Sequence, residues 1–255
     1  MFVDTHCHLD FEQYNDDREQ VIQRAIKNKI TSIITIGIDK KTSKKAIELA
    51  EKFAIIFAAV GIHPNDSKDV DEEMIKKIGE MAQHKKVVAI GEIGLDYYRN
   101  YSPIDTQQKI FRRQLQLAIE LELPVIVHNR NANEDIVKIL IDEKAYKVSG
   151  VLHSFSGDLN TLNQALNRNF FISFTGPVTF KNTNYDMLIN KTPLEQLLLE
   201  TDSPFLAPVP FRGKRNEPSY LKYTAEKIAK IKNISIEELA QITSENAKNL
   251  FKLSV

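Results

Sequence analysis

Two histidines share one short motif near the start of the chain. His6 and His8 stand two positions apart in VDTHCHLD, and residues i and i+2 of a β-strand point to the same face of a sheet. Their imidazoles are therefore expected side by side, an arrangement that chelates divalent ions such as Zn, Mn or Fe. Taken alone, the pair is explained equally well by two polar residues that are hydrogen-bonded at a strand end.

Four further residues of metal-binding type each follow an apolar run. They are Glu92 in VVAIGEIGLD, His128 in LPVIVH, His153 in VSGVLH and Asp202 in LLLETDSP. Burying a carboxylate such as Glu92 is costly unless a cation or another partner lies opposite. A salt bridge would satisfy Glu92, and either lone histidine is explained by a hydrogen bond, but the repeated pattern favours one shared site.

Together these six residues predict a binuclear metal site. Six ligands exceed what one tetrahedral ion requires, so we expect two divalent cations (Mg, Mn or Zn), with Glu92 as the bridge between them. Asp202 is expected to hold a metal and to orient the attacking water. A divalent cation lowers the pKa of water toward about 7, and a second cation stabilises negative charge on the reacting oxygen. The predicted reaction is hydrolysis.

The elements that must position these residues are short apolar runs separated by stretches with helical spacing. Such alternation is typical of βα units around a parallel sheet. One intervening helix is expected at 106–121, where Phe111, Leu115 and Ala118 share a face. The eight expected strands cover residues 2–8, 31–38, 55–62, 87–93, 124–128, 148–153, 170–175 and 197–202.

Eight such strands in 255 residues predict an α/β fold, a single-domain (β/α)8 TIM barrel over residues 1–255. Four of the six histidines, with Glu92 and Asp202, fall at or next to the ends of these strands. The active site of such a barrel is built at the C-terminal ends of its strands, so the candidate ligands should converge on one rim. An open doubly wound sheet is the alternative fold, but the glycine-rich turn after its first strand is missing.

Charge, cysteine content and hydropathy limit the binding partners and the cellular location to be expected for the protein. Thirty-four basic residues balance 34 acidic ones, so any nucleic acid would have to be bound by a local basic patch. The single cysteine, Cys7, cannot form an internal disulfide and fits a reducing compartment. We find no signal peptide and no run that approaches the roughly 20 apolar residues of a membrane helix. We expect a cytoplasmic protein, monomeric and without a membrane partner.

The motifs also occur in a familiar order. The series VDTHCHLD, GIHP, AIGEIGLDYY, VHNR, VLHSFSG, ETDSP and RGKRNEP resembles that of the TatD family of metal-dependent DNases, from Val3 to Pro218. The segment SENAKNLF resembles the final helix of that family. Because the family is similar to the wider amidohydrolase superfamily, the resemblance implies a (β/α)8 barrel with one or two divalent cations that hydrolyses nucleic-acid phosphodiesters.

The resemblance also implies a role for each ligand. His6 and His8 would bind one metal, His128 and His153 would bind the second, and Glu92 would be shared or adjacent. Asp202 would be the remaining ligand and the general base. After the fifth-strand histidine the family usually has Ser-Arg, whereas this chain has Asn129 and Arg130, a departure able to alter substrate contacts.

Basic residues near the expected rim are candidates for binding substrate phosphates. They are Arg130, Arg212, Lys214 and Arg215, and an arginine can grip phosphate with a planar bidentate fork. A solvated basic loop is the alternative for the last three. His63 in GIHP is predicted on the same rim as a catalytic residue that contacts substrate or stabilises a leaving group; a polar rim residue is the alternative.

Other candidates in the rim loops are expected to be structural. Tyr97, Tyr98 and Tyr101 could stack on bases, but aromatic residues of a long loop more often pack it onto the barrel. His84 lies in a helix-to-strand connection and is expected at the opposite end of the barrel.

The favoured function is a DNase, acting as a 3′–5′ exonuclease because a site in a barrel mouth suits a chain end. An amide, ester or D-aminoacyl-tRNA hydrolase is the alternative enzyme, since the same two-metal chemistry attacks carbonyl groups. Converging cations would favour phosphodiesters, and an apolar pocket would favour carbonyl substrates. A third alternative is a binding protein whose metals serve only stability, but the surplus of ligands at the catalytic rim argues against it.

Overall fold

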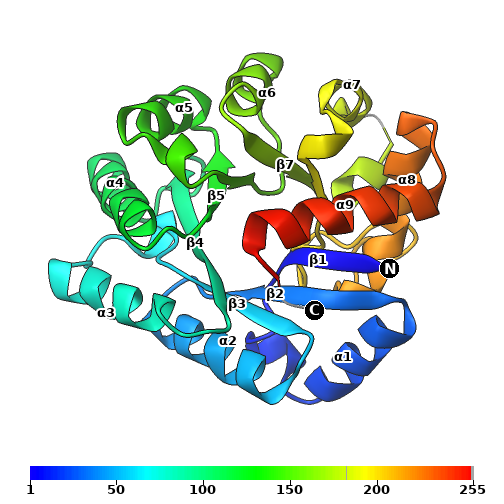
Figure 1. Ribbon diagram of the computed structural model, residues 1–255, viewed down its shortest axis with the longest axis horizontal. Coiled ribbons are helices and arrows are strands. Elements are labelled where there is room, and N and C mark those ends of the chain that lie inside the picture. The colour runs from blue at the N-terminus through cyan, green and yellow to red at the C-terminus, as the bar shows by residue number, and fades with distance from the viewer. Residues whose placement is uncertain (182, 254–255) are drawn as a thin grey trace.

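The computed structural model describes residues 1–181 and 183–253. Its strands form one parallel sheet in the order β1 to β8, and most helices lie around this ring, while α9 crosses one end of it (Figure 1). The predicted (β/α)8 TIM barrel is thereby confirmed. The strands are β1 (Phe2–Cys7), β2 (Ile30–Ile36), β3 (Ile56–Val60), β4 (Val87–Asp96), β5 (Val125–Arg130), β6 (Gly150–Leu152), β7 (Phe170–Phe174) and β8 (Leu197–Leu199).

The helices follow the strands in turn, except that two follow β8. They are α1 (Arg18–Lys27), α2 (Lys40–Lys52), α3 (Glu72–Ala82), α4 (Ile104–Glu120), α5 (Asn133–Asp142), α6 (Leu159–Leu166), α7 (Tyr185–Lys191), α8 (Leu221–Lys232) and α9 (Ile236–Phe251). The helix expected at 106–121 is α4, which begins two residues earlier. Within the described residues, no helix combines the length and apolar character needed to span a membrane.

The ring closes between β1 and the segment that follows β8. The backbone N–H of Asp202 donates to the carbonyl of His6 at 2.9 Å, and that of His8 donates to the carbonyl of Ser203 at 2.7 Å. The buried Asp4 carboxylate accepts hydrogen bonds from the backbone N–H and the hydroxyl of Thr201, at 3.0 and 2.7 Å. These bonds bring Asp202 beside the two histidines of β1.

Helix α9 closes the N-terminal end of the barrel. A small apolar cluster joins strand residues such as Ile34, Ile126 and Leu198 to Ala247 and Phe251 of α9. The Ser244 hydroxyl of the same helix donates to the carbonyl of Met1 at 3.1 Å, just before β1 begins. The opposite, C-terminal end of the barrel is therefore the end left for a site.

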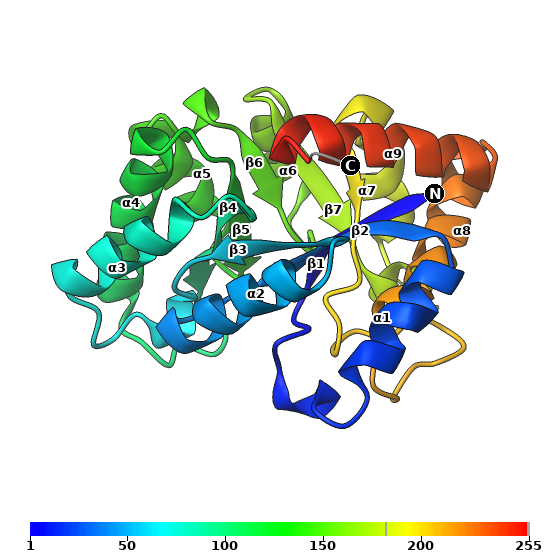
Figure 2. The same cartoon turned by 60° about the horizontal axis from the view of Figure 1, so that its bottom comes forward.

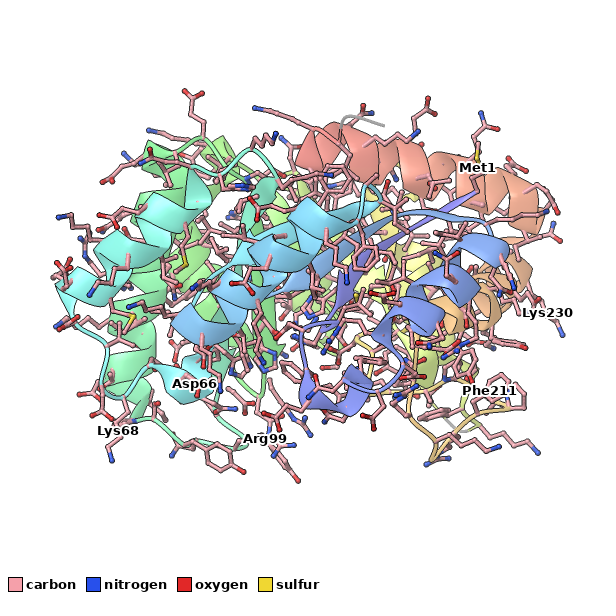
Figure 3. All side chains as sticks on the ribbon, turned by 90° about the horizontal axis from the view of Figure 1, so that it is seen from below. Met1, Asp66, Lys68, Arg99, Phe211 and Lys230 are labelled. Carbon is pink, nitrogen blue, oxygen red and sulfur yellow. The ribbon has the colours of Figure 1, made fainter. Side chains whose placement is uncertain are left out.

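The long loops gather at that C-terminal end. The segments after β1 and β8 extend together on the side of the barrel away from α9 (Figure 2). In Figure 3, Asp66, Arg99 and Phe211, from the loops after β3, β4 and β8, lie along the edge opposite Met1. The loops at 97–103 and 203–217 are thus parts of one rim.

Strands β6 and β8 are among those that end sooner than the sequence predicts. The runs 148–153 and 197–202 form ladders only over Gly150–Leu152 and Leu197–Leu199. Beyond these ladders Ser154 and Asp202 have φ values of 44° and 53°, in the left-handed region that no strand uses. His153 and Asp202 therefore stand on turns just beyond their strands.

Candidate metal centre

Four donor atoms form a compact cluster at the closure of the barrel. His6 Nε2 and His8 Nε2 lie 3.2 Å apart. Glu92 Oε2 is 3.5 and 3.7 Å from these nitrogens, and Asp202 Oδ1 is 3.7 and 3.5 Å from them. Tetrahedral donors at about 2.1 Å from one ion would be separated by about 3.4 Å. The spacing of the cluster therefore fits a divalent ion.

A second cluster lies on the other oxygen of Glu92. Glu92 Oε1 is 2.8 Å from His128 Nδ1 and 2.8 Å from His153 Nε2, and the two nitrogens are 3.2 Å apart. His63 Nε2 is 3.6 Å from the same oxygen. Because Glu92 Oε2 faces the first cluster and Oε1 faces the second, this carboxylate stands in the position of a bridging ligand.

Outer hydrogen bonds fix the orientation of two of these imidazoles. His8 Nδ1 is 3.0 Å from the backbone carbonyl of Ile36, which can only accept, so this nitrogen carries the proton. His128 Nε2 is 3.3 Å from Asp96 Oδ2. With the proton on the outer nitrogen, the remaining nitrogen, His8 Nε2 or His128 Nδ1, is the one that can offer a lone pair to a metal ion.

The two carboxylates of the clusters are held ionised. Burial raises the pKa of Glu92, but the nearby His153, His63 and His128 outweigh this effect and hold it well below its usual range. Burial likewise raises the pKa of Asp202, and the hydrogen bond from His8 with the nearby histidines lowers it overall. Buried imidazoles and charged carboxylates form the mixed donor set that Zn, Mn and Fe bind.

His63 differs from the other histidines of the site. Its Nδ1 accepts a hydrogen bond from the backbone N–H of Asn65 at 3.1 Å, so the ring proton lies on Nε2. Burial lowers the pKa of His63 to about 3, and the ring is neutral at physiological pH. His63 Nε2 is thus a hydrogen-bond donor that faces the site, not a lone pair free for a metal.

A comparison with known protein families agrees with the motif series of the sequence. The model of the family described as TatD related DNase matches residues 3–252. The chain belongs to the TatD family.

Several TatD-family proteins resemble it over their whole length. The metal-dependent hydrolase YabD of Bacillus subtilis, described as uncharacterized, is 49% identical over 255 residues, which cover 100% of both chains. The 3′-5′ ssDNA/RNA exonuclease TatD of Salmonella typhimurium is 33% identical over 257 residues, 98% of each chain. The crystal structure of the TatD homologue YjjV of Escherichia coli superposes with a TM-score of 0.93 at 30% identity, covering 99% of this chain and 98% of that one. The protein is a metal-dependent hydrolase of the TatD family.

The basic residues predicted near the rim of this TatD-family barrel have different surroundings. The guanidinium of Arg130 lies 4.3 Å from the ring centre of Tyr98, and that of Arg212 lies 4.3 Å from the ring centre of Phe180. Arg215 instead forms an ion pair with Asp17 at 2.6 Å. Arg130, Arg212 and Lys214 are exposed, and none of them forms an ion pair with the described residues.

The expectation that the loop tyrosines pack onto the barrel holds for one of three. Tyr97 donates its hydroxyl to Asp135 at 2.8 Å. Tyr98 and Tyr101 are 63% and 65% exposed, so for them the packing prediction is wrong. The Arg130 guanidinium lies over one face of the exposed Tyr98 ring.

Two further side chains, His84 and Asn216, have simple structural roles. His84 precedes β4, at the end of the barrel opposite the site as expected, and pairs with Glu51 at 3.1 Å. Asn216 donates its side-chain amide to the carbonyls of Thr201 and Phe205 at 2.9 and 2.7 Å. It therefore fixes the loop after β8 to the end of that strand.

Two carboxylates of the site were missed by the sequence reasoning. Asp96 contacts His128, as described above, and the buried Glu200 lies 3.5 Å from His153 Nδ1. The signal for each is spacing: Asp96 follows Glu92 by four positions and Glu200 precedes Asp202 by two, so an extended chain would turn each pair to one face. Both acids stand one layer behind the candidate ligands.

Proposed function

We propose that this metal-dependent hydrolase is a nuclease with two divalent cations, which cleaves single-stranded DNA from its 3′ end. The observation that carries the proposal is the position of Glu92, whose two carboxylate oxygens face two separate nitrogen pairs. The relatives named 3′-5′ ssDNA/RNA exonuclease TatD support nucleic acid as substrate and a chain end as the point of attack.

The ligands divide between the two cations by their contacts. His6, His8, Glu92 and Asp202 would hold the first, and Glu92, His128 and His153 would hold the second. Such ions supply an acidified water and positive charge opposite the scissile phosphate.

The chain's own residues then act on protons and phosphate. Asp202, with a side chain 15% exposed against 5% for Glu92, faces the mouth and accepts the proton of the attacking water. His63 donates a hydrogen bond from its Nε2–H to an oxygen of the phosphate, where negative charge grows during the reaction. Arg130, Arg212 and Lys214 bind phosphates of neighbouring nucleotides.

Arg215 is left out of this phosphate-binding set. Its guanidinium donates to both carboxylate oxygens of Asp17 and to the carbonyl of Gln13, so we assign it to holding the loop after β8. The remaining cations at the rim, which form no ion pair with the described residues, favour phosphodiesters over the alternative amide, ester or D-aminoacyl-tRNA substrates.

The test is cleavage by protein stripped of metal and reloaded separately with Mg, Mn or Zn. Single-stranded DNA and RNA labelled at the 5′ end, together with a panel of small esters and amides, serve as substrates. We expect a ladder of 5′-labelled DNA products that shortens by single nucleotides. Asp202→Ala should abolish it, and His84→Ala, at the far end of the barrel, should not. Turnover of esters or amides without DNA cleavage would refute the nuclease assignment.

A further inference from the structure

Glu200 is a fully buried carboxylate just behind the candidate metal centre. It is 0% exposed. Its Oε1 accepts the backbone N–H of Ser154 at 2.6 Å and lies 3.5 Å from His153 Nδ1. Its Oε2 is buried without a hydrogen-bond partner among the described residues. Glu200 therefore has acceptor capacity to spare in the interior of the barrel.

Two imidazoles beside Glu200 each have a buried ring nitrogen that could donate to such an acceptor. The rings of His6 and His153 stack with centroids 4.1 Å apart and an angle of 9° between their planes. Each directs Nε2 toward Glu92, at 3.5 and 2.8 Å. The Nδ1 atoms of both are buried and lack a hydrogen-bond partner within the described part of the chain. One ring nitrogen of each histidine and a carboxylate oxygen of Glu200 all lie within 4.8 Å of one another.

The coordination chemistry of imidazole explains how Glu200 can pair with the Nδ1 atoms of His6 and His153. An imidazole that binds a metal through Nε2 carries its proton on Nδ1, and that proton needs an acceptor. His8 has the carbonyl of Ile36 for this purpose, and His128 has Asp96 on its outer nitrogen. For His6 and His153 the acceptor within reach is Glu200, directly for His153 and through one bridging water for His6.

We propose that Glu200 is a positioning residue shared by the two metal subsites. It holds His6, from the first donor cluster, and His153, from the second, in the tautomer with the proton on Nδ1 and the lone pair on Nε2. One buried carboxylate thereby sets the metal affinity of both subsites. The part of this inference that concerns affinity rests on the proposed two-cation site, whereas the part that concerns tautomers does not.

The test compares Glu200→Gln with Asp96→Asn, a matched loss of one buried charge beside a single ligand, His128. Because burial lowers the pKa of His153 less than the nearby carboxylates raise it, nitrogen-15 NMR of the imidazoles in metal-free protein is recorded at a pH high enough for the rings to be neutral, and there it reports the tautomers. In Glu200→Gln we expect both His6 and His153 to lose the uniform Nδ1–H form, and in Asp96→Asn we expect neither to change. Calorimetric titration with Mn²⁺ should show both binding steps weakened about 10- to 100-fold by Glu200→Gln and only one by Asp96→Asn.

Several outcomes would overturn the proposal. Unchanged tautomers in Glu200→Gln would remove it, and a change at His153 alone would remove the shared role. Circular dichroism checks that the variant folds; if it does not, Glu200→Asp, which keeps the charge on a shorter side chain, should retain the tautomer at His153 and weaken it at His6. A parent protein that binds a single Mn²⁺ would contradict the two-cation site of the proposed function, while the NMR result would still decide the role of Glu200.

Discussion

At the scale of single residues, the histidines of the rim divide into candidate metal ligands and a hydrogen-bond donor, His63. The division depends on which nitrogen carries the proton. His8 donates from Nδ1 to a backbone carbonyl, whereas His63 accepts at Nδ1 from a backbone N–H. Identical side chains therefore present a lone pair in one case and an N–H in the other.

This difference predicts that His63→Ala impairs catalysis without loss of metal. Removal of one donor aimed at the developing charge should lower kcat about 100- to 1000-fold, with KM and metal content unchanged. Steady-state kinetics and elemental analysis measure these quantities on the same sample, with His84→Ala as the control for loss of a histidine. A His63→Ala protein that has lost half its metal would instead make His63 a ligand.

Residue type and position predicted the candidate ligands, but not what lies behind them. His6, His8 and His128 could be recognised because imidazole at the end of an apolar strand is conspicuous. Glu200 lies in the same motif as Asp202. From sequence alone, however, a carboxylate within an expected strand is interpreted as a solvated residue or an ion-pair partner. Its role depends on the stacking of His6 on His153, a contact between β1 and the end of β6 that no local pattern encodes.

At the scale of elements, the close approach of β4 and β5 decides whether Glu92 and His128 can meet. Gly94 pairs with His128 in this ladder and has a φ of 140°. A Cβ atom added there would collide with the carbonyl oxygen of His128. We therefore expect Gly94→Ala to destabilise the fold by about 3 kcal/mol or more and to reduce metal content.

A second glycine of the rim provides the control for this substitution. Gly213 also has a positive φ, 85°, but a Cβ there would meet nothing within 4 Å. Gly213→Ala should cost only the backbone strain, about 1 kcal/mol. Urea unfolding and metal analysis compare the two variants; equal losses of stability would show that crowding against His128 is unimportant.

The loop after β8 is fastened to α1 by charged groups, and this contact predicts a pH dependence. Asp17 accepts from Arg215 at 2.6 Å and from Arg24 at 3.1 Å, and the hydrogen bond from Arg215 lowers its pKa from 3.8 to about 2. Because the folded pKa lies below the unfolded one, the contact contributes fully above about pH 4 and is lost as the pH falls toward 2.

Asp17→Asn should therefore lower the melting temperature at pH 7 but not in acid. A partly exposed network of this kind contributes about 1 kcal/mol at most, which corresponds to about 2 to 4 °C in a chain of this size. The difference in Tm between parent and variant should be constant from pH 7 to 5 and should shrink below about pH 4. A difference that grows on acidification would contradict the ion-pair assignment.

Strand ends mark the limit of prediction at this scale. The apolar runs located all eight strands, because burial on both faces leaves a continuous signal. They placed His153 and Asp202 inside strands, whereas the structure has both on turns after β6 and β8. The turns arise from long-range bonds, such as Ser154 N–H to Glu200, that lie outside any local window.

At the scale of the whole molecule, the donor groups of the candidate metal centre are enclosed in the interior of the barrel. Helix α9 covers one end of the strands, and the loops after β1, β4 and β8 surround the other (Figure 2). Several ionisable groups are buried between them, including Asp4, Glu92 and Glu200. Binding of divalent cations to this interior must therefore stabilise the fold as well as supply chemistry.

That coupling predicts how the melting temperature depends on metal concentration. Each occupied site adds about 1.4 kcal/mol per tenfold increase of free metal above its Kd, or about 3 to 5 °C here. Two sites should double this slope. His8→Ala removes a donor of the first cluster alone, so its slope should be about half that of the parent, while His84→Ala should keep the full slope. Differential scanning fluorimetry across a Mn²⁺ series measures all three; equal slopes in the parent and His8→Ala would mean that a single cation stabilises the barrel.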